Sequence, residues 1–305
     1  MASLPSEVRI VEVGPRDGLQ NEPERLETRV KAGFIERLAR CGLKQIEATS
    51  FVHPKAIPQL ADAEEVVRQL PPVPGVTFSV LVPNEKGLER AVQSGVKRIA
   101  VFTAASDTFA KKNINMSVDE SLTVFGRIVP AAIGGGMTVR GYVSTSFVCP
   151  YEGNVPKERV REVSQRLLDL GMDEVAISDT IGAAAPTDIV ETLGLLLKSV
   201  PVERVALHLH DTYGTALANV LAGLQLGVAT FDASAGGLGG CPFAPGAAGN
   251  LATEDLVYML DRMGIHTGID AQALVAASSF IAEALGRPLP SKLWQRRSAG
   301  RDRAV

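Results

Sequence analysis

Two histidines, one residue apart, form a candidate metal-binding pair. His208 and His210 stand in the stretch VALHLHDTYG, which reads as a β-strand. Side chains two residues apart on a strand point to the same side, so both imidazoles face one point. Neutral imidazoles are common ligands of divalent metals. The pair alone is equally typical of core histidines, so residues elsewhere in the chain have to decide between the two readings.

Polar residues that could complete a metal site stand where other strands should end. Asp17 follows VEVGPR near the start, and Asn250 follows the glycine-rich segment AGGLGGCP. Two nitrogen and two oxygen ligands suit a six-coordinate Mg²⁺ or Mn²⁺ ion with open positions for substrate oxygens. Structural zinc fits poorly because C-x₂-C pairs are missing. Taken singly, Asp17 is equally typical of a turn and Asn250 of a helix N-cap.

A fixed cation is expected beside this site. Arg16 precedes Asp17 and could stabilise negative charge on a carbonyl oxygen, as in an oxyanion hole. It could also form a plain ion pair with Glu47 or Asp179. The two roles are compatible, because a buried arginine needs a carboxylate to hold its orientation.

One of the three cysteines is a candidate acid or base. Cys241 lies in the loop GGLGGCP, whose glycines suggest a segment that moves or approaches a ligand closely. A thiol there could transfer a proton to or from a carbon centre. Cys41 and Cys149 are expected to be structural. Three cysteines form no disulfide framework, which favours a reducing compartment.

Eight β-rich runs alternate with amphipathic helical segments. The predicted strands are Val8–Val13, Gln45–Thr49, Thr77–Val82, Arg98–Thr103, Thr138–Ser144, Glu174–Ser178, Arg204–His210 and Thr230–Ser234. The predicted helices are Thr28–Cys41, Ile57–Leu70, Glu85–Ser94, Ser117–Ile133, Pro156–Leu170, Pro186–Ser199, Gly214–Leu226, Thr253–Met263 and Asp270–Leu285. This order predicts parallel strands with right-handed crossovers.

The predicted fold is an α/β protein of the (β/α)₈ TIM-barrel type with an extra C-terminal helix. An open doubly wound sheet is disfavoured, because no G-x-G-x-x-G follows the first strand and the polar groups come from many strand ends. In such barrels the catalytic face lies at the C-terminal ends of the strands. Candidate substrate contacts there, besides Arg16, are Gln20, Ser50, Tyr142, Ser144 and Thr180.

The barrel is expected to be one domain over residues 1–285, followed by a basic tail, 286–305, that should be poorly ordered. The chain has 305 residues, is 46% hydrophobic and carries a formal net charge of −3. This balance gives no indication of nucleic-acid binding. No apolar run could span a membrane, and the N-terminus resembles neither a signal peptide nor a transit peptide. A cytoplasmic enzyme is therefore predicted.

Several motifs, taken together, resemble the 3-hydroxy-3-methylglutaryl-CoA lyase family of metal-dependent TIM-barrel lyases. They run in order from about Val8 to about Leu285 and include EVGPRDGLQNE, IEATSF, SDTIG, HLHDTYG and GLGGCPFAPGAAGN. The resemblance implies cleavage of this acyl-CoA to acetyl-CoA and acetoacetate, in a homodimer. It implies the metal ligands Asp17, His208, His210 and Asn250. It further implies that Arg16 neutralises the enolate, Cys241 protonates it, Glu47 holds Arg16 and Asp179 lies near the substrate hydroxyl.

Two departures from the family pattern leave alternatives open. Pro23 stands where some members carry a basic residue, and the run from Ser144 to Val148 is bulkier than the family's glycine-containing loop. A related branched 3-hydroxyacyl-CoA is therefore an alternative substrate. A Claisen-type synthase joining acetyl-CoA to a 2-oxo acid, a pyruvate-type aldolase and an acyl-CoA sensor are further alternatives. The initial general base is left open among Asp17, Asp179 and a histidine, as is the pathway, leucine breakdown or ketone-body formation.

Overall fold

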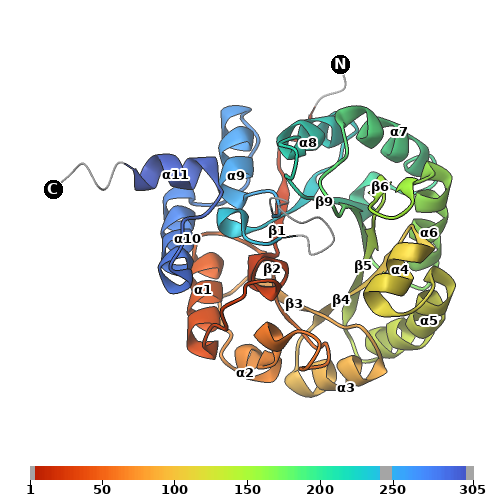
Figure 1. Ribbon diagram of the computed structural model, residues 1–305, viewed down its shortest axis with the longest axis horizontal. Helices are drawn as coiled ribbons and strands as arrows, with labels where there is room; N and C mark the ends of the chain where they lie inside the picture. The colour runs from red at the N-terminus through yellow and green to blue at the C-terminus, as the bar shows by residue number, and fades with distance from the viewer. Residues whose placement is uncertain (1–3, 241–248, 300–305) are drawn as a thin grey trace.

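All eight predicted strands form, and they close into a parallel barrel (Figure 1). The computed structural model describes residues 4–240 and 249–299. Around the barrel the strands are β1 (Arg9–Glu12), β10 (Thr230–Ala233), β9 (Val205–Leu209), β8 (Glu174–Asp179), β5 (Thr138–Ser144), β4 (Arg98–Ala104), β3 (Thr77–Leu81) and β2 (Gln45–Ser50). Pairing of β1 with both β10 and β2 closes the ring. The predicted TIM barrel is confirmed.

Eight helices, one after each strand, surround the barrel. They are α1 (Thr28–Arg40), α2 (Ala63–Arg68), α3 (Glu85–Ser94), α5 (Val118–Gly134), α6 (Lys157–Asp169), α7 (Pro186–Leu196), α8 (Ala216–Gln225) and α9 (Thr253–Arg262). The start of α5 is a capping box, in which Ser117 Oγ accepts from the Glu120 N–H and the Glu120 carboxylate accepts from the Ser117 N–H.

The prediction of one helix over residues 57–70 is wrong, because the observed helix is shorter. The structure has a short 3₁₀ turn, η2 (Pro58–Leu60), followed by α2. The Gln59 carbonyl accepts from the Lys31 ammonium, and the Gln59 side chain bonds to the backbone at Glu24 and Leu26. Gln59 is therefore used to attach the β1–α1 loop, and a regular helix begins only after it.

Further elements lie in the loops and at the C-terminal end. The helix α4 (Asp107–Ile114) follows β4, and β6 (Val148–Cys149) pairs antiparallel with β7 (Gly153–Asn154). Short turns are η1 (Gly14–Gly18), η3 (Val202–Arg204) and η4 (Ala235–Gly237). The expected last helix is α10 (Ala271–Leu285), and a further helix, α11 (Lys292–Ser298), forms where a frayed tail was expected.

The helix α11 has a specific anchor. The Asp255 carboxylate on α9 accepts from the N–H groups of Lys292 (2.9 Å) and Leu293 (2.8 Å), and Trp294 packs against the core. An anion at a helix N-terminus satisfies the free N–H groups of the first turn. In Figure 1, α10 and α11 lie outside the ring, beside α1 and α9.

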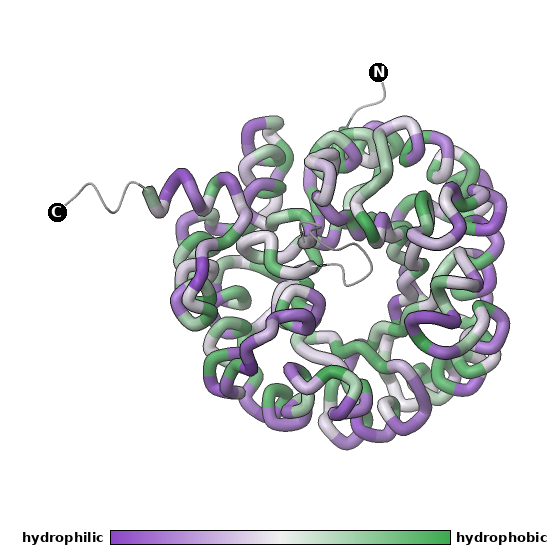
Figure 2. The backbone as a smooth tube through the Cα atoms, viewed as in Figure 1, coloured by the Kyte–Doolittle hydropathy of each residue, from purple (hydrophilic) through white to green (hydrophobic). Residues whose placement is uncertain are grey.

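The main core lies between the strands and the helices, and hydrophobic positions gather on the barrel side of the helices (Figure 2). The inside of the barrel differs, because it holds a small apolar cluster with three alanines. Its members are Leu81, Ala100, Tyr142, Ala176 and Ala206. Small side chains on the strands leave room for buried charged residues and for a pocket above them. In the part of the chain that the structure describes, no helix is long and apolar enough to cross a membrane.

Candidate active site

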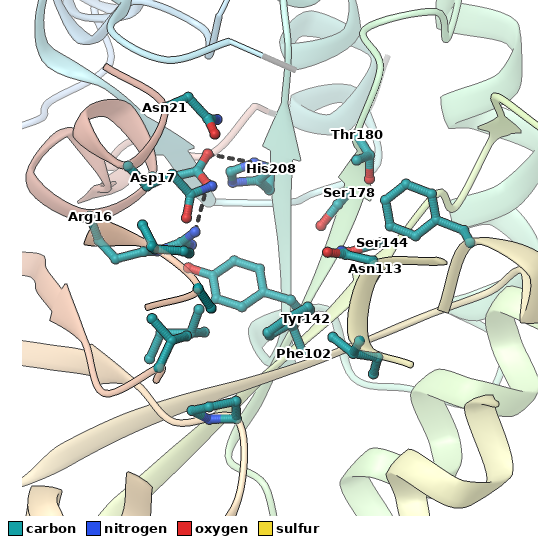
Figure 3. A pocket seen from close by; sticks show the side chains of 18 of the residues that line it. Arg16, Asp17, Asn21, Phe102, Asn113, Tyr142, Ser144, Ser178, Thr180 and His208 are labelled. Atoms are coloured by element: carbon teal, nitrogen blue, oxygen red, sulfur yellow. Dashed lines mark hydrogen bonds and ion pairs between the residues drawn. The ribbon is translucent and has the colours of Figure 1, made fainter. Parts of the chain in front are cut away.

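A pocket of about 530 Å³ opens at the C-terminal ends of the strands, where the barrel fold places active sites. Figure 3 shows two polar walls facing each other. Arg16, Asp17 and His208 make one wall. The opposite wall carries the side chains of Asn113, Ser144, Ser178 and Thr180, with Tyr142 and Phe102 between the walls. Charge is thus concentrated on one side and neutral donors on the other.

Asp17, His208 and His210 form a largely buried group that fits a divalent metal site. One potential ligand atom from each lies within 4.8 Å of the others. The Nε2 atoms of both histidines lie 3.8 Å from Asp17 Oδ2. Burial works against the Asp17 charge, but Arg16 and the two histidines lower the pKa of its carboxyl below the usual value. The carboxylate is therefore ionised and available as a ligand.

Asn250 joins this group through an unexpected pairing of backbone. Asn250 forms an antiparallel bridge with His210, and the Leu251 N–H donates to the Leu209 carbonyl (2.9 Å), so this segment pairs beside the end of β9. Asn250 Nδ2 donates to Asp17 Oδ2 (2.9 Å). Its Oδ1 atom is buried and has no partner among the described residues. An amide oxygen without a partner is a suitable extra ligand for a hard cation, so the four predicted ligands fit such an ion.

Two glycines allow these segments to approach. A Cβ on Gly239 would lie 2.6 Å from Asn250 Nδ2, and Gly239 has φ +123°, which L side chains rarely adopt. A Cβ on Gly18 would lie 2.8 Å from Ser234 Oγ and 2.9 Å from Leu238 Cβ. Glycine is therefore required where the first and last loops of the barrel meet.

Arg16 and Asp17 are adjacent, yet both reach the pocket because their loop is a π-helical turn, η1. The N–H groups of Arg16, Asp17 and Gly18 all lie within 3.2 Å of the Val13 carbonyl oxygen. Such turns are rare and often occur at functional sites.

The Arg16 guanidinium is held between two carboxylates. Its Nη1 donates to Asp17 Oδ1 (2.5 Å) and its Nε donates to Glu47. Burial disfavours its charge, but Glu47 and Asp17 raise its pKa above the ordinary value. Arg16 is thus a fixed cation in the pocket wall, and its partner is Glu47 rather than Asp179. The ion pair and a role towards substrate oxygens are compatible in this geometry.

Two buried residues behind the pocket were missed in the sequence analysis. Asp232 on β10 accepts from Arg140 on β5 (2.6 Å), and its other oxygen lies 3.1 Å from His208 Nδ1. Arg140 also donates to the Tyr142 hydroxyl (3.1 Å). Strand alternation was a usable signal for Arg140, because it shares a face with Tyr142, whereas the pairing of Asp232 with His208 is set by the sheet.

The other predicted site residues divide into two groups. Gln20, Ser144 and Thr180 line the pocket, and Gln20 Nε2 donates to Asp17 Oδ1 (3.0 Å). Ser50 and Asp179 are not among the described lining residues.

Asp179 points away from the pocket because it follows Ser178, and successive residues of a strand face opposite sides. Its carboxylate accepts from the N–H groups of Ala183 and Ala184 (3.0 Å each). Burial raises its pKa, although these backbone bonds oppose the shift. Ser50 Oγ donates to the Leu81 carbonyl (3.3 Å). The predicted catalytic Cys241 lies outside the described residues.

Comparison with known proteins shows which family this chain belongs to. The family model described as HMGL-like matches residues 7–281, which is most of the chain. The chain belongs to the HMGL-like family. A curated relative of this family, "Hydroxymethylglutaryl-CoA lyase, mitochondrial" from Bos taurus, is 52% identical over 295 residues, covering 97% of this chain and 91% of its own.

Solved structures of this HMGL-like type superpose closely. The HMG-CoA lyase of Bacillus subtilis has a TM-score of 0.95 at 49% identity, covering 97% of this chain and 99% of its own. An HMG-CoA lyase from Acinetobacter baumannii, solved with coenzyme A and 3-methylmalate, has a TM-score of 0.92 at 39% identity. It covers 97% of this chain and 96% of its own.

Proposed function

We propose that this HMGL-like protein is a divalent-metal-dependent hydroxymethylglutaryl-CoA lyase, a carbon–carbon lyase that converts 3-hydroxy-3-methylglutaryl-CoA to acetyl-CoA and acetoacetate. The observation that carries the proposal is the group Asp17, His208 and His210 beside the fixed cation Arg16. The relatives named as this lyase, at about half identity over nearly the whole chain, support the same substrate.

The reaction breaks the bond between C2 and C3 of the acyl chain. The C3 hydroxyl loses its proton and becomes the ketone of acetoacetate, and the electron pair of the broken bond moves to C2. That pair is delocalised onto the thioester oxygen as an enolate, and one proton delivered to C2 completes acetyl-CoA. The site must therefore stabilise charge on two oxygens and supply one proton.

The charged wall of the pocket suits both oxygens. We infer that Asp17, His208, His210 and Asn250 hold Mg²⁺ or Mn²⁺, which when bound lowers the pKa of a hydroxyl group and orients the substrate. The Arg16 guanidinium is positioned to neutralise the thioester enolate oxygen, and Glu47 fixes its orientation. Cys241 is the proposed proton donor to C2, on the strength of the family resemblance.

The positions of the side chains reduce the number of residues that could take the proton from the substrate hydroxyl. Asp179 is bonded to its own loop and turned from the pocket, which argues against it. Asp17 and His210 face the pocket, so we propose the base among them, whereas both nitrogens of His208 are engaged by Asp232 and the metal position. Candidate substrate contacts on the neutral wall are Ser144 and Thr180.

The acyl group is proposed to be joined to coenzyme A. The Acinetobacter baumannii relative was solved with coenzyme A, and the pocket here is lined by apolar as well as polar residues, which suits a pantetheine arm. The apolar lining residues include Val52, Ile57, Pro83, Ile114 and Met116. Of the bulky run from Ser144 to Val148, only Ser144 is among the described lining residues, so the run gives no support for a longer-branched substrate.

The test is an assay of acetoacetate release from 3-hydroxy-3-methylglutaryl-CoA by protein treated with EDTA and then reloaded. Activity is expected only after Mg²⁺ or Mn²⁺ is added. A panel of 3-hydroxyacyl-CoA thioesters with longer branches measures specificity, and a thiol assay with acetyl-CoA and a 2-oxo acid tests the synthase alternative. Faster cleavage of a panel member, or CoA release in the thiol assay without lyase activity, contradicts the proposal.

A homodimer and a cytoplasmic location remain proposals. The family resemblance supports the dimer, and buried free cysteines Cys41 and Cys149 suit a reducing compartment. The bovine relative is named as mitochondrial. Light scattering of the purified protein and fractionation of expressing cells test the two proposals separately.

A further inference from the structure

Arg140 occupies a central position inside the barrel. It lies on β5, is 2% exposed, and makes two hydrogen bonds and one further ionic contact. Nη2 donates to Asp232 Oδ1 (2.6 Å), Nη1 donates to the Tyr142 hydroxyl (3.1 Å), and Nε lies 2.8 Å from Glu174 Oε1. Because a guanidinium is planar and rigid, two directed hydrogen bonds hold its orientation, and Glu174 adds an ionic contact.

One branch from Arg140 leads to the metal group. Asp232 Oδ2 lies 3.1 Å from His208 Nδ1. A carboxylate can only accept, so Nδ1 carries the hydrogen and Nε2 keeps its lone pair on the side facing Asp17. His210 differs, because its Nδ1 is buried without a partner among the described residues. Arg140 therefore holds Asp232, and Asp232 fixes the tautomer and ring orientation of His208 but not of His210.

A second branch leads to the fixed cation. The Tyr142 hydroxyl accepts from Arg140 and donates to Glu47 Oε2 (3.1 Å). The other oxygen of Glu47 accepts from Arg16 Nε. Figure 3 shows the Tyr142 hydroxyl directed towards Arg16. The orientation of Arg16 thus depends, through Glu47 and Tyr142, on the same guanidinium that orients His208.

We propose that Arg140 is a positioning residue for the charged wall of the pocket, because it orients both His208 and Arg16. It acts on His208 through Asp232, and on Arg16 through Tyr142 and Glu47. Arg140 is not among the described residues that line the pocket, so it acts through its neighbours. Its two branches predict separable effects: one on metal affinity, the other on turnover. The kinetic part rests on the proposed function, whereas the metal-binding part does not.

The experiment measures Mn²⁺ affinity by EPR of the free ion, together with kcat and KM for 3-hydroxy-3-methylglutaryl-CoA. Asp232→Asn breaks the first branch and should weaken Mn²⁺ binding by about 10- to 100-fold. Tyr142→Phe breaks the second and should lower kcat at least about tenfold, with Mn²⁺ affinity and KM within about threefold of the parent. Arg140→Lys keeps the charge but loses the fork, and should show both effects.

A matched control is Arg98→Lys. Arg98 is also buried in the barrel, on β4, but its guanidinium pairs with Asp173 (2.6 Å) and Thr138 (3.1 Å) at the end away from the pocket. It lies 3.7 Å from Glu174 Oε1, the atom that Arg140 Nε also contacts, but Glu174 belongs to neither branch. Mn²⁺ affinity and kcat of this variant should match the parent. The double variant Arg140→Lys with Asp232→Asn should bind Mn²⁺ as weakly as Asp232→Asn alone, because Arg140 acts on His208 only through Asp232.

Three results overturn the proposal. The first is an Arg140→Lys protein with parental Mn²⁺ affinity and kcat. The second is Asp232→Asn and Tyr142→Phe proteins that shift both readouts equally, as a general structural defect does. The third is an Arg98→Lys protein that loses as much as Arg140→Lys. If circular dichroism shows that Arg140→Lys does not fold, the other two variants test the proposal. It then stands only if Asp232→Asn changes mainly Mn²⁺ affinity and Tyr142→Phe changes mainly kcat. If the parent binds Mn²⁺ without cleaving the thioester, the proposed function fails, and the Asp232→Asn binding result still decides the first branch.

Discussion

Replacement of Glu12 by glutamine should change how the stability of this protein depends on pH. Glu12 ends β1 and is fully buried. Its Oε1 accepts from the N–H groups of Gly14 and Ala235 (2.8 Å each), and Oε2 accepts from the Thr253 hydroxyl (2.7 Å). It therefore joins the loop that carries Arg16 and Asp17 to the loop after β10.

Burial raises the pKa of Glu12 from 4.5 to about 8, although its three hydrogen bonds oppose the shift. Because the folded pKa lies above the unfolded pKa, the stability contributed by the group is complete below pH 4.5 and is lost as pH rises to about 8. At about 1.36 kcal/mol per pH unit, the total loss approaches about 5 kcal/mol, of which about 2 kcal/mol falls between pH 6 and pH 8.

Glutamine mimics the protonated acid, because its oxygen can accept both N–H groups and its amide can donate to Thr253. The Glu12→Gln protein should therefore be close to the parent at pH 5 and more stable by several kcal/mol at pH 9. Urea unfolding at pH 5 to 9, in EDTA so that bound metal contributes nothing, measures this difference. Titrating groups that do not interact with Glu12 are common to both proteins and cancel. Glu254, whose burial raises its pKa to about 7, does interact with Glu12, so the same comparison is repeated in a Glu254→Gln background.

Thr253→Val provides a second comparison, in which Glu12 still titrates but at a different pH. The Thr253 hydroxyl lowers the Glu12 pKa, so its loss should move the region of falling stability to higher pH. If the free energies of unfolding of Glu12→Gln and the parent differ by a constant from pH 5 to 9, Glu12 does not carry the raised pKa. A growing advantage of the parent at high pH would reverse the sign and refute the reasoning.

Three more predictions concern the site and the fold. Arg16→Gln should lower kcat about 10²- to 10³-fold with a smaller change in KM, measured by steady-state kinetics, because a fixed cation stabilises charge that develops during the reaction. Gly239→Ala should weaken Mn²⁺ binding and lower stability by about 1–3 kcal/mol, since its Cβ would lie 2.6 Å from Asn250 Nδ2; parental values in EPR titration and urea unfolding would contradict this. Mn²⁺ at about 100 times its Kd should stabilise the parent by about 2.7 kcal/mol, and Asp17→Asn should abolish most of that gain in thermal unfolding.

Local sequence pattern determined the strands and most of the helices. Each strand is a short apolar run between a helix stop and a loop, and its predicted bounds lie within one residue of the observed ones. The same pattern placed Asp17, His208 and His210 at strand ends, and in a parallel barrel all strand ends meet at one face. The convergence of these three side chains therefore followed from chain order and alternation alone.

Pairings between distant strands were decided only by the closed barrel. Nothing local indicates that Asn250 pairs beside the end of β9 and so reaches His210, or that Asp232 stands between Arg140 and His208. Asp179 shows the converse, because its motif suggested the pocket whereas strand alternation turned it to its own loop. Arg140 on β5 takes its partner Asp232 from β10, which is not a neighbouring strand but faces it across the inside of the barrel. Which buried charges face each other there is fixed by closure of the ring, not by residues adjacent in sequence.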